Sequence, residues 1–401
     1  MRGKDVCDSI MFMMSKTTKK IKLASPIDCT ACAACVSVCP QKCISMVEDK
    51  EGFLQPKIDT KQCILCHKCE KTCPILNTES ISDDFETKAY AVINKDDEIR
   101  AQSSSGGVFF PLAKWVIEQG GVVFGARWND KWDVVHDYAE DIEGVKAFMR
   151  SKYVQSVVGD TLKQAKDFLD SGRWVLYSGT PCQLGGLRAY LGKEYDKLIQ
   201  VDLICHGVPS PGVWRSYLKD YFGKDELLDV NFRDKREGWL NFQCVTTTAT
   251  TTICEKQMGN PYFKGFLNNV YLRNSCYGCR FRQYHRTSDI TLADYWGVNK
   301  LCLDMYDDKG TSIVFVHSQK GQYLMDKVCD NMIILEQVKE NAILYNASVI
   351  QSMTMPDTRK VYFTTFRHIG FARSAFLLNN KSLYNRITRK LRKVLMTILH
   401  R

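Results

Sequence analysis

Long apolar runs are missing from this 401-residue sequence. No stretch reaches the roughly 18 to 20 apolar residues that a membrane-spanning helix needs, and the run from Ile10 to Met14 is too short for the core of a signal peptide. Zinc-finger spacing, an RNA-recognition signature and a basic block with interleaved aromatic residues are also missing. We therefore expect a cytoplasmic protein that does not bind nucleic acid. The net charge of +10 instead favours an anionic cofactor, an acidic protein or a membrane surface as partner.

Cysteine, in contrast, is abundant and clustered. Ten of the 18 cysteines lie between Cys7 and Cys73. In the reducing cytoplasm, clustered cysteines usually hold a metal rather than form disulfides. The cluster therefore points to a metal-binding domain near the N-terminus.

Two copies of one motif hold eight of these cysteines. Each copy reads Cys-x-x-Cys-x-x-Cys-x-x-x-Cys-Pro, and the second copy begins 34 residues after the first. This spacing lets three thiolates on one tight turn bind three irons of a 4Fe-4S cluster, while the fourth cysteine ligates the other cluster. We therefore predict two such clusters, one held by Cys29, Cys32, Cys35 and Cys73 and the other by Cys63, Cys66, Cys69 and Cys39.

A zinc ribbon is the weaker interpretation of the same cysteines. It also uses Cys-x-x-Cys pairs, but one site needs only four ligands and not two interleaved quartets. Cys43 has no counterpart after Cys73, and we expect it to be a small core residue. The same role is expected for the cysteines outside any motif, namely Cys7, Cys244, Cys254, Cys302 and Cys329.

Composition and periodicity divide the chain into five parts. Short apolar runs alternate with helical patterns from Ala89 onward, which predicts an α/β domain. Segments around Val230–Phe232 and Phe242–Cys254 are typical of antiparallel strands and make the sheet mixed. We predict an α+β protein with a leader (1–24), a small bacterial-type ferredoxin domain (25–77), a polar linker (78–88), a larger α/β domain with a mixed sheet (89–345) and an extension (346–401).

The extension ends in a basic amphipathic helix over Asn385–Arg401. Its apolar and basic faces fit peripheral contact with an acidic membrane surface. They fit docking onto the protein itself or onto a partner equally well.

Four further cysteines stand in separate contexts, and spacing alone does not join them. Thr180 is typical of an N-cap and Pro181 of a first helical residue, so Cys182 is expected at a helix N-terminus that favours a thiolate. Such a cysteine is a metal ligand, a nucleophile paired with His206, or a buried small hydrophobic residue. Basic residues also crowd the segment after Cys279, as an anion-binding rim or as a solvated face.

Five motifs in order resemble those of the coenzyme F-420 hydrogenase/dehydrogenase beta-subunit family. The resemblance covers about Asp28 to Asn346, and the motifs are Ser104-Ser105-Gly106-Gly107, Tyr177-Ser178-Gly179-Thr180-Pro181-Cys182-Gln183, Asp202-Leu203-Ile204-Cys205-His206-Gly207-Val208-Pro209-Ser210, Cys276-Tyr277-Gly278-Cys279 and Ser288-Asp289-Ile290-Thr291-Leu292-Ala293-Asp294-Tyr295-Trp296-Gly297. Membership implies an oxidoreductase whose larger domain binds FAD and a 4Fe-4S cluster. The resemblance thus implies a third quartet of ligands, formed by Cys182, Cys205, Cys276 and Cys279.

The flavin site is also drawn from this resemblance. The segment 103–107 precedes a predicted helix starting near Val108, so free amides and glycines allow an anionic ligand to approach, although a plain capped helix has the same pattern. The segment 150–156 resembles a second cofactor contact, in which Lys152 donates to a phosphate or to the reduced flavin. The implied flavin residues are Ser104, Ser105, Gly106, Gly107, Lys152, Tyr153, Gln155, Ser156 and Asp294.

These parts suggest one route for electrons. Iron–sulfur clusters exchange single electrons, a flavin holds one or two, and an organic acceptor takes a pair. We expect a ferredoxin or another low-potential donor on one side, and a small two-electron acceptor, the deazaflavin coenzyme or a metabolite, on the other. The alternative is a non-catalytic electron-transfer subunit of a larger hydrogenase or dehydrogenase complex.

Overall fold

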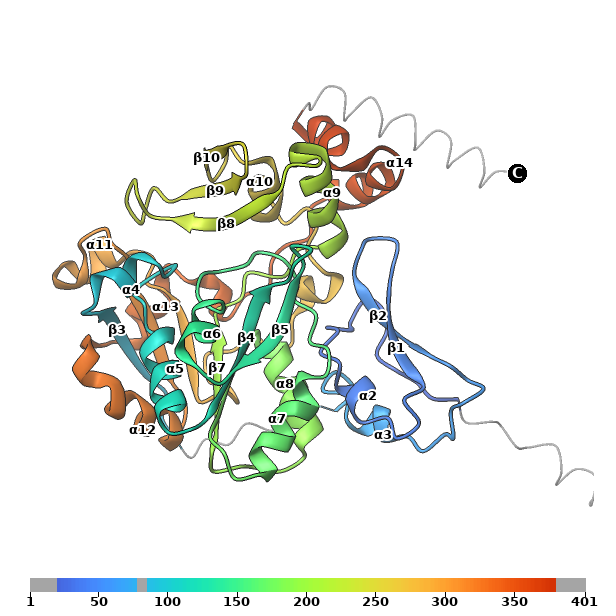
Figure 1. Cartoon of the computed structure of the whole chain (residues 1–401), viewed down its shortest axis with the longest axis horizontal. Coiled ribbons are helices and arrows are strands. Elements are labelled where there is room, and N and C mark those ends of the chain that lie inside the picture. The colour runs from blue at the N-terminus through green and yellow to red at the C-terminus, as the bar shows by residue number, and fades with distance from the viewer. Residues whose placement is uncertain (1–19, 78–84, 380–401) are drawn as a thin grey trace, which may run out of the picture.

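The computed structural model describes residues 20–77 and 85–379 (Figure 1). Most of the predicted leader and linker, and the basic helix Asn385–Arg401, lie outside the described residues. Among the described helices, none combines the length and apolar character needed to cross a membrane. In Figure 1 a small part made of residues 20–77, here called the head, lies beside a larger α/β part.

The large part is built on an eight-stranded mixed sheet, as the sequence predicted. Its strand order is β13-β3-β12-β11-β7-β6-β4-β5. The four strands β11, β7, β6 and β4 run parallel to one another, and the outer strands pair antiparallel. The strand bounds are β3 Lys88–Asn94, β4 Val122–Trp128, β5 Val134–Ala139, β6 Val175–Gly179, β7 Leu198–Leu203, β11 Ile290–Asp294, β12 Ser312–Val316 and β13 Met332–Gln337.

Helices cover both faces of this sheet because its central strands are apolar on both sides. In β4, Val123 packs in a cluster with helices α5 (Phe109–Glu118) and α12 (Gln319–Val328). Val122 and Phe124 face the opposite way, toward α7 (Thr161–Asp170) and α8 (Pro181–Leu191). This alternation follows from the two-residue period of a strand. Shorter helices at the sheet ends are α4 Asp97–Ala101, α6 Ile142–Lys146, α11 Val298–Leu301 and α13 Lys339–Leu344.

A smaller antiparallel sheet carries the second core. Its strand order is β10-β9-β8, with bounds β8 Leu227–Asp234, β9 Gln243–Thr248 and β10 Thr252–Lys256, which includes the two segments expected to be antiparallel. Helices α9 (Pro211–Phe222), α10 (Pro261–Leu267) and α14 (Thr358–Asn379) contribute aromatic residues to this core, and α14 packs against α9. Tyr362, Phe363 and Phe371 of α14 are buried. The packed core therefore continues past residue 345, the position at which the sequence pattern ended the larger domain.

The head repeats one local structure twice. It consists of the hairpin β1 (Ile44–Glu48) and β2 (Leu54–Ile58), with short helices α2 (Ala34–Ser37) and α3 (Lys68–Lys71) inside the two cysteine motifs. Each helix follows a residue with left-handed backbone, Ala33 (φ 62°) in the first copy and His67 (φ 58°) in the second. These tight turns bring successive cysteines of each motif to one side.

Hydrogen bonds join the head closely to the larger part. Arg273, which is almost fully buried, donates from Nε to the Cys29 carbonyl oxygen at 2.6 Å and from Nη2 to the Leu54 carbonyl oxygen at 3.0 Å. Glu51 accepts two hydrogen bonds from the Arg359 guanidinium at 3.0 and 2.5 Å. Since both arginines belong to the larger part, their hydrogen bonds hold the head in a defined place.

The pair Glu51–Arg359 gives a direct test of this docking. We expect Glu51→Gln to lower the free energy of unfolding by about 2–3 kcal/mol, because a largely buried guanidinium loses its counter-charge. Glu48→Gln is the matched control in the same hairpin, since the Glu48–Arg215 pair is more exposed and is worth about 1 kcal/mol or less. Urea unfolding of anaerobically purified protein measures both. Equal, small losses of unfolding free energy in the two variants would show that the Glu51–Arg359 pair does not hold the head.

Candidate functional site

The first cysteine quartet lines one cavity within the head. Its four members come from both motif copies, because Cys73 of the second copy lies in the cavity of Cys29, Cys32 and Cys35 of the first. Apolar residues complete the wall, among them Leu23 and Ile75. Burial is the main cause that raises the pKa of Cys32, to about 11. Four thiols in an apolar shell fit a 4Fe-4S cluster, whose irons would compensate the thiolate charge.

The second quartet has the same arrangement in its own cavity. Cys39 of the first motif copy joins Cys63, Cys66 and Cys69 of the second. Cys43 also lines this cavity, with its Sγ 3.4 Å from the Sγ of Cys39, and it is buried. The residue expected to be a core cysteine therefore lies directly beside the second quartet.

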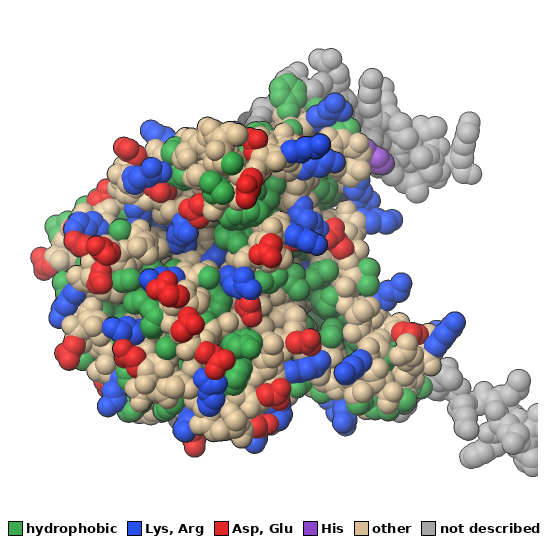
Figure 2. Space-filling model, in the orientation of Figure 1, with side chains coloured by type: hydrophobic (Ala, Val, Ile, Leu, Met, Phe, Trp, Pro, Cys, Tyr) green, Lys and Arg blue, Asp and Glu red, His purple; other side chains and the backbone are tan. Residues whose placement is uncertain are grey.

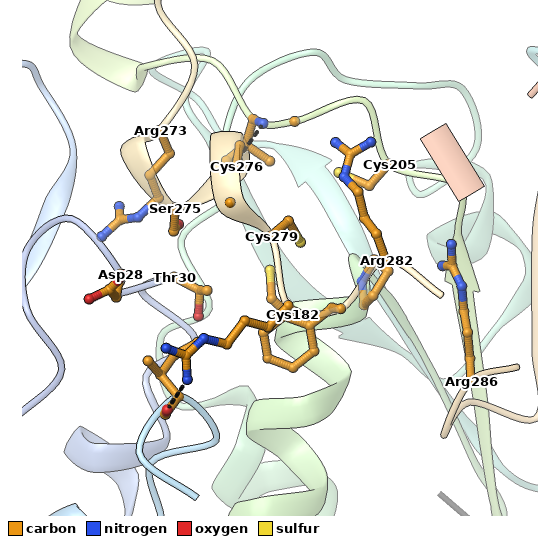
Figure 3. Close-up of a pocket in the computed structure, with 17 residues that line it drawn as sticks. Asp28, Thr30, Cys182, Cys205, Arg273, Ser275, Cys276, Cys279, Arg282 and Arg286 are labelled. Atoms are coloured by element: carbon orange, nitrogen blue, oxygen red, sulfur yellow. Dashed lines mark hydrogen bonds between the residues drawn. The ribbon is translucent and has the colours of Figure 1, made fainter. Parts of the chain in front are cut away.

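The other four cysteines meet in a third cavity, where the larger part contacts the head. Cys182, Cys205, Cys276 and Cys279 all line it, and Figure 3 shows them around a common space. Burial is the main cause that raises the pKa of Cys276, to about 12, and nearby Cys205 adds to the effect. Four thiols converging from three separate segments fit a third cluster in donor chemistry, as they do in the head.

Local structure explains how these four residues converge. Cys182 sits in the first turn of α8, whose start is fixed by Pro181 and by a capping box between Thr180 and Gln183. Cys205 follows the end of β7, and Cys276 lies in a 3₁₀ turn, η1 (Asn274–Gly278). Strand β7 is parallel to β6, which leads into α8, so the segments that follow both strands leave the same edge of the sheet.

The proposed nucleophilic pair of Cys182 and His206 is not brought together. His206 Nε2 is 2.7 Å from Asn269 Oδ1, and its ring packs edge-on against Phe266. Cys182 instead lies 3.2 Å from the Thr180 hydroxyl, beside the other cysteines of the cavity. The geometry thus favours a ligand role for Cys182.

The first and third cavities share a wall. Thr30 and Ile75 line both of them. Gly186 of α8 packs directly against Cys32, because a Cβ at position 186 would lie only 2.6 Å from the Cβ of Cys32. The first and third cysteine quartets therefore line adjacent cavities that have two wall residues in common.

Arginines surround the third cavity. Arg282 and Arg286 both line it (Figure 3). Arg286 is buried and its Nη1 donates to Asp202 Oδ2 at 3.0 Å, while Thr291 Oγ1 donates to Asp202 Oδ1 at 2.5 Å. Burial raises the pKa of Asp202 even though Arg286 opposes the shift. Arg286 is thus a fixed internal cation and not part of a solvated face.

Part of the predicted flavin set gathers around another buried arginine, Arg233. Its guanidinium donates to both oxygens of Asp294 at 2.9 Å, and it contacts the Ser104 carbonyl oxygen and the Tyr153 hydroxyl at 3.4 Å. The ring of Phe242 lies 3.9 Å from its carbon Cζ. From the sequence, Arg233, Lys235 and Arg236 form a basic group that is either an anion-binding rim or a solvated face, and Arg233 is not among the implied flavin residues.

The Ser-Ser-Gly-Gly loop is held mainly by the protein itself. A Cβ at Gly106 would lie 2.4 Å from the Val92 carbonyl oxygen, so packing against β3 demands this glycine. The Ser104 hydroxyl accepts from the Ser151 amide at 2.8 Å, and the Ser105 hydroxyl donates to the Thr311 carbonyl oxygen at 2.9 Å. Gly107 has a left-handed backbone (φ 82°), a conformation that also favours glycine.

This loop still leaves donors for an anionic ligand. Within residues 20–77 and 85–379, the backbone amides of Ser104 and Ser105 have no hydrogen-bond partner. Lys235 Nζ donates to the Ser105 carbonyl oxygen at 2.9 Å, and burial together with nearby Arg100 lowers the pKa of Lys235 to about 7. Free amides next to Arg233 fit the phosphates of a dinucleotide.

The remaining predicted flavin residues lie elsewhere or are already engaged. Lys152 is buried, which lowers its pKa to about 7, and its Nζ donates to the carbonyl oxygens of Ala147 and Met149 at 2.7 and 2.6 Å. Gln155 and Ser156 line a different cavity, of about 240 Å³, between the head and the larger part. Gln155 Nε2 donates to the Thr30 carbonyl oxygen at 3.0 Å. The structure therefore divides the set that the resemblance had joined.

Comparisons with known proteins agree with the motifs. Residues 172–341 match the family model for the C terminus of the coenzyme F420 hydrogenase/dehydrogenase beta subunit, and residues 28–76 match the model "4Fe-4S dicluster domain". A curated relative, the F subunit of the F(420)H(2) dehydrogenase of Methanosarcina mazei, is 23% identical over 325 residues, which are 78% of this chain and 85% of the relative. A chain of the F420-reducing [NiFe] hydrogenase complex from Methanosarcina barkeri aligns with 18% identity and a TM-score of 0.45, over 67% of this chain and 90% of that one. Residues 172–341 thus match the C-terminal domain of the coenzyme F-420 hydrogenase/dehydrogenase beta-subunit family, and residues 28–76 match a 4Fe-4S dicluster domain.

Proposed function

We propose that this chain is an iron–sulfur flavoprotein that transfers electrons between a low-potential one-electron donor and a small two-electron acceptor. The observation that carries the proposal is the shared wall of the first and third cavities, made by Thr30 and Ile75. It supports electron transfer between the first and the third quartet. Electrons would enter the larger part at the N-terminus of α8, where Cys182 lies.

The proposed cofactors are three 4Fe-4S clusters and one FAD. When bound, the clusters supply one-electron exchange and FAD supplies the conversion between single electrons and pairs. The chain's own contribution is to fix positions and charges. Arg273 holds the head in place, Arg286 is held by Asp202 beside the third quartet, and Arg233 is held by Asp294 beside the Ser104 loop.

For FAD, we propose the site around Ser104, Ser105 and Arg233. The unpaired amides of the two serines would bind phosphate, and the Arg233 guanidinium, held by Asp294, and Lys235 Nζ would lie beside it as donors. The cavity at Gln155 and Ser156 touches the first quartet through Ala31 and Ala33, and it is the second place where a flat ring system could lie.

The acceptor belongs to one of two classes. The name of a relative, F(420)H(2) dehydrogenase, favours the deazaflavin coenzyme as the two-electron partner, although that name describes electrons leaving the reduced coenzyme, the reverse of the proposed direction. The identity of 23% leaves room for another metabolite.

A second candidate function is that of a non-catalytic electron-transfer subunit. The name of the curated relative favours it, since that protein is one subunit of a dehydrogenase. Turnover by the isolated chain separates the two. With reduced ferredoxin as donor and the deazaflavin coenzyme as acceptor, a self-sufficient enzyme bleaches the coenzyme absorbance. A subunit without its own catalysis gives no bleaching and copurifies with a large catalytic partner.

Removing one cysteine of the third quartet tests the third cluster. We expect Cys279→Ala to lower the iron content from about twelve to about eight per chain, one 4Fe-4S cluster. The matched control is Cys329→Ala, because Cys329 is exposed and lies outside all three quartets, and it should leave the iron content unchanged. Iron and sulfide are quantified after anaerobic reconstitution. Unchanged iron together with lost activity would instead support thiol chemistry at this cavity.

The flavin proposal is tested at Arg233. We expect Arg233→Lys to weaken FAD binding about tenfold, because lysine keeps the charge but loses the two-pronged contact that aligns Asp294 with the Ser104 loop. Iron content should not change. The control is Arg127→Lys, where a half-exposed Arg127–Asp137 pair is altered in the same way. FAD is measured by fluorescence after release. Equal flavin retention in both variants would place the cofactor elsewhere, with the cavity at Gln155 as the next position to test.

A further inference from the structure

We propose that the outer end of the head, centred on Cys66, is the docking surface for an acidic one-electron carrier protein. The inference rests on the proposed function, since it names where the low-potential donor binds. It is drawn from the exposure of the cysteine ligands, from the distribution of charge over the head, and from the contacts that occupy the head's other side.

Exposure singles out one ligand of the head. Cys66 is exposed, whereas Cys29, Cys32 and Cys69 are buried. The two residues before Cys66 are apolar and exposed, Ile64 by 59% and Leu65 by 45%. A carrier that covers this tip would therefore approach the second quartet with no protein layer between them. An exposed apolar centre is also typical of an interaction surface.

Basic residues surround this apolar tip. The exposed lysines Lys61, Lys68 and Lys71 lie in the same motif copy or next to it, and Lys42 precedes Cys43 in the wall of the second cavity. None of these four forms an ion pair in the part of the chain that the structure describes. Their charge is thus available to a partner.

The acidic residues of the head are mostly engaged elsewhere. Glu48 pairs with Arg215 and Glu51 with Arg359, both on the larger part. Asp28 lines the third cavity. Near the tip, two carboxylates accept hydrogen bonds within the head, Glu70 from His67 and the Lys22 amide and Asp59 from the Lys61 amide and Gln62. Free ammonium groups therefore predominate at the outer end, while paired carboxylates predominate at the junction with the larger part.

The opposite side of the head is not available to a carrier. Helix α2 packs on α7 and α8, and Arg273 occupies the carbonyl groups of Cys29 and Leu54. Figure 1 shows the β1–β2 hairpin extending away from α3, the helix that follows Cys66 in the sequence. Within the described residues of the head, the Cys66 end alone combines an exposed ligand, apolar residues and unpaired lysines. Figure 2 shows blue side chains on the outer surface of this small part.

This surface fits a partner with carboxylates around its own redox centre. Complementary charge accelerates association and orients the encounter, and salt weakens it. A small apolar centre with a charged rim is also what a brief electron-transfer contact needs, because the product complex must dissociate.

Charge reversal at the tip tests the proposal. We expect the triple variant Lys61→Glu, Lys68→Glu, Lys71→Glu to lower the second-order rate of cluster reduction by an acidic bacterial-type ferredoxin at least tenfold at low salt. The salt dependence should flatten, and reduction by dithionite should be unchanged. The comparison is Lys68→Glu against Lys50→Glu, because Lys50 is exposed at the hairpin turn and undergoes the same charge change. If Lys50→Glu slowed reduction by ferredoxin as much as Lys68→Glu does, the effect of charge would not be local to the Cys66 end, and the proposal would be wrong.

A second measurement uses the unaltered protein. Carbodiimide coupling to the same ferredoxin, followed by mass spectrometry, should join its carboxylates to Lys42, Lys61, Lys68 or Lys71. Crosslinks confined to other lysines would overturn the proposal, as would clusters that dithionite reduces but ferredoxin does not. The experiment distinguishes failure of the docking proposal from failure of the proposed function. Normal reduction of the head by ferredoxin with no reduction of any acceptor would leave the docking surface in place and remove the enzyme activity.

Discussion

The contact between Cys32 and Gly186 sets the distance on which the proposed electron route depends. A Cβ at position 186 would come within 2.6 Å of the Cys32 Cβ, so any other residue there would push the head away from α8. The same helix carries Cys182 in its first turn, one turn before Gly186. Because a helix is rigid over one turn, the head contact and the third quartet are linked by a fixed length. The hydrogen bonds of Arg273 and Arg359 then hold the head against this helix.

Buried arginines are the second constraint. Arg233, Arg273 and Arg286 are all buried, and each donates to carboxylate or carbonyl oxygens that fix its position. A buried cation is costly unless it is paired. Arg273 and Arg286 both line the third cavity, where their charges act on the cysteines. Thiolate-bound clusters carry negative charge, and fixed cations nearby stabilise their more reduced states. At Cys205, Arg282 acts in this direction, although burial still raises the pKa of the thiol.

Local sequence predicted the head because all its information is local. The repeat of 34 residues and the division of its cysteines into two quartets can be read from spacing, and left-handed Ala33 and His67 occupy equivalent places in the two copies. The hairpin β1–β2 was not predicted. The third quartet has no such signal, since Cys182, Cys205 and Cys276 come from a helix, a strand end and a 3₁₀ turn. These cysteines come together because of the order of the strands in the sheet, which their spacing does not reveal. Only the family resemblance could therefore suggest the third quartet. The Ser-Ser-Gly-Gly loop has a clear motif, but the motif alone does not indicate a ligand. Close packing against β3 requires Gly106, and the hydroxyls of Ser104 and Ser105 form hydrogen bonds within the protein.

The C-terminal extension has a larger structural part than its thin pattern suggested. Arg359 of α14 donates to Glu51 in the head and to the Leu272 carbonyl oxygen, and its Cζ lies 5.6 Å from the Tyr277 ring centre. Tyr277 lies between Cys276 and Cys279, so the Arg359 side chain contacts the head and the segment of the third cysteine quartet together. Aromatic residues of α14, such as Tyr362 and Phe371, hold the helix in the second core. Helix α14 therefore helps to fix the head relative to the segment that carries Cys276 and Cys279.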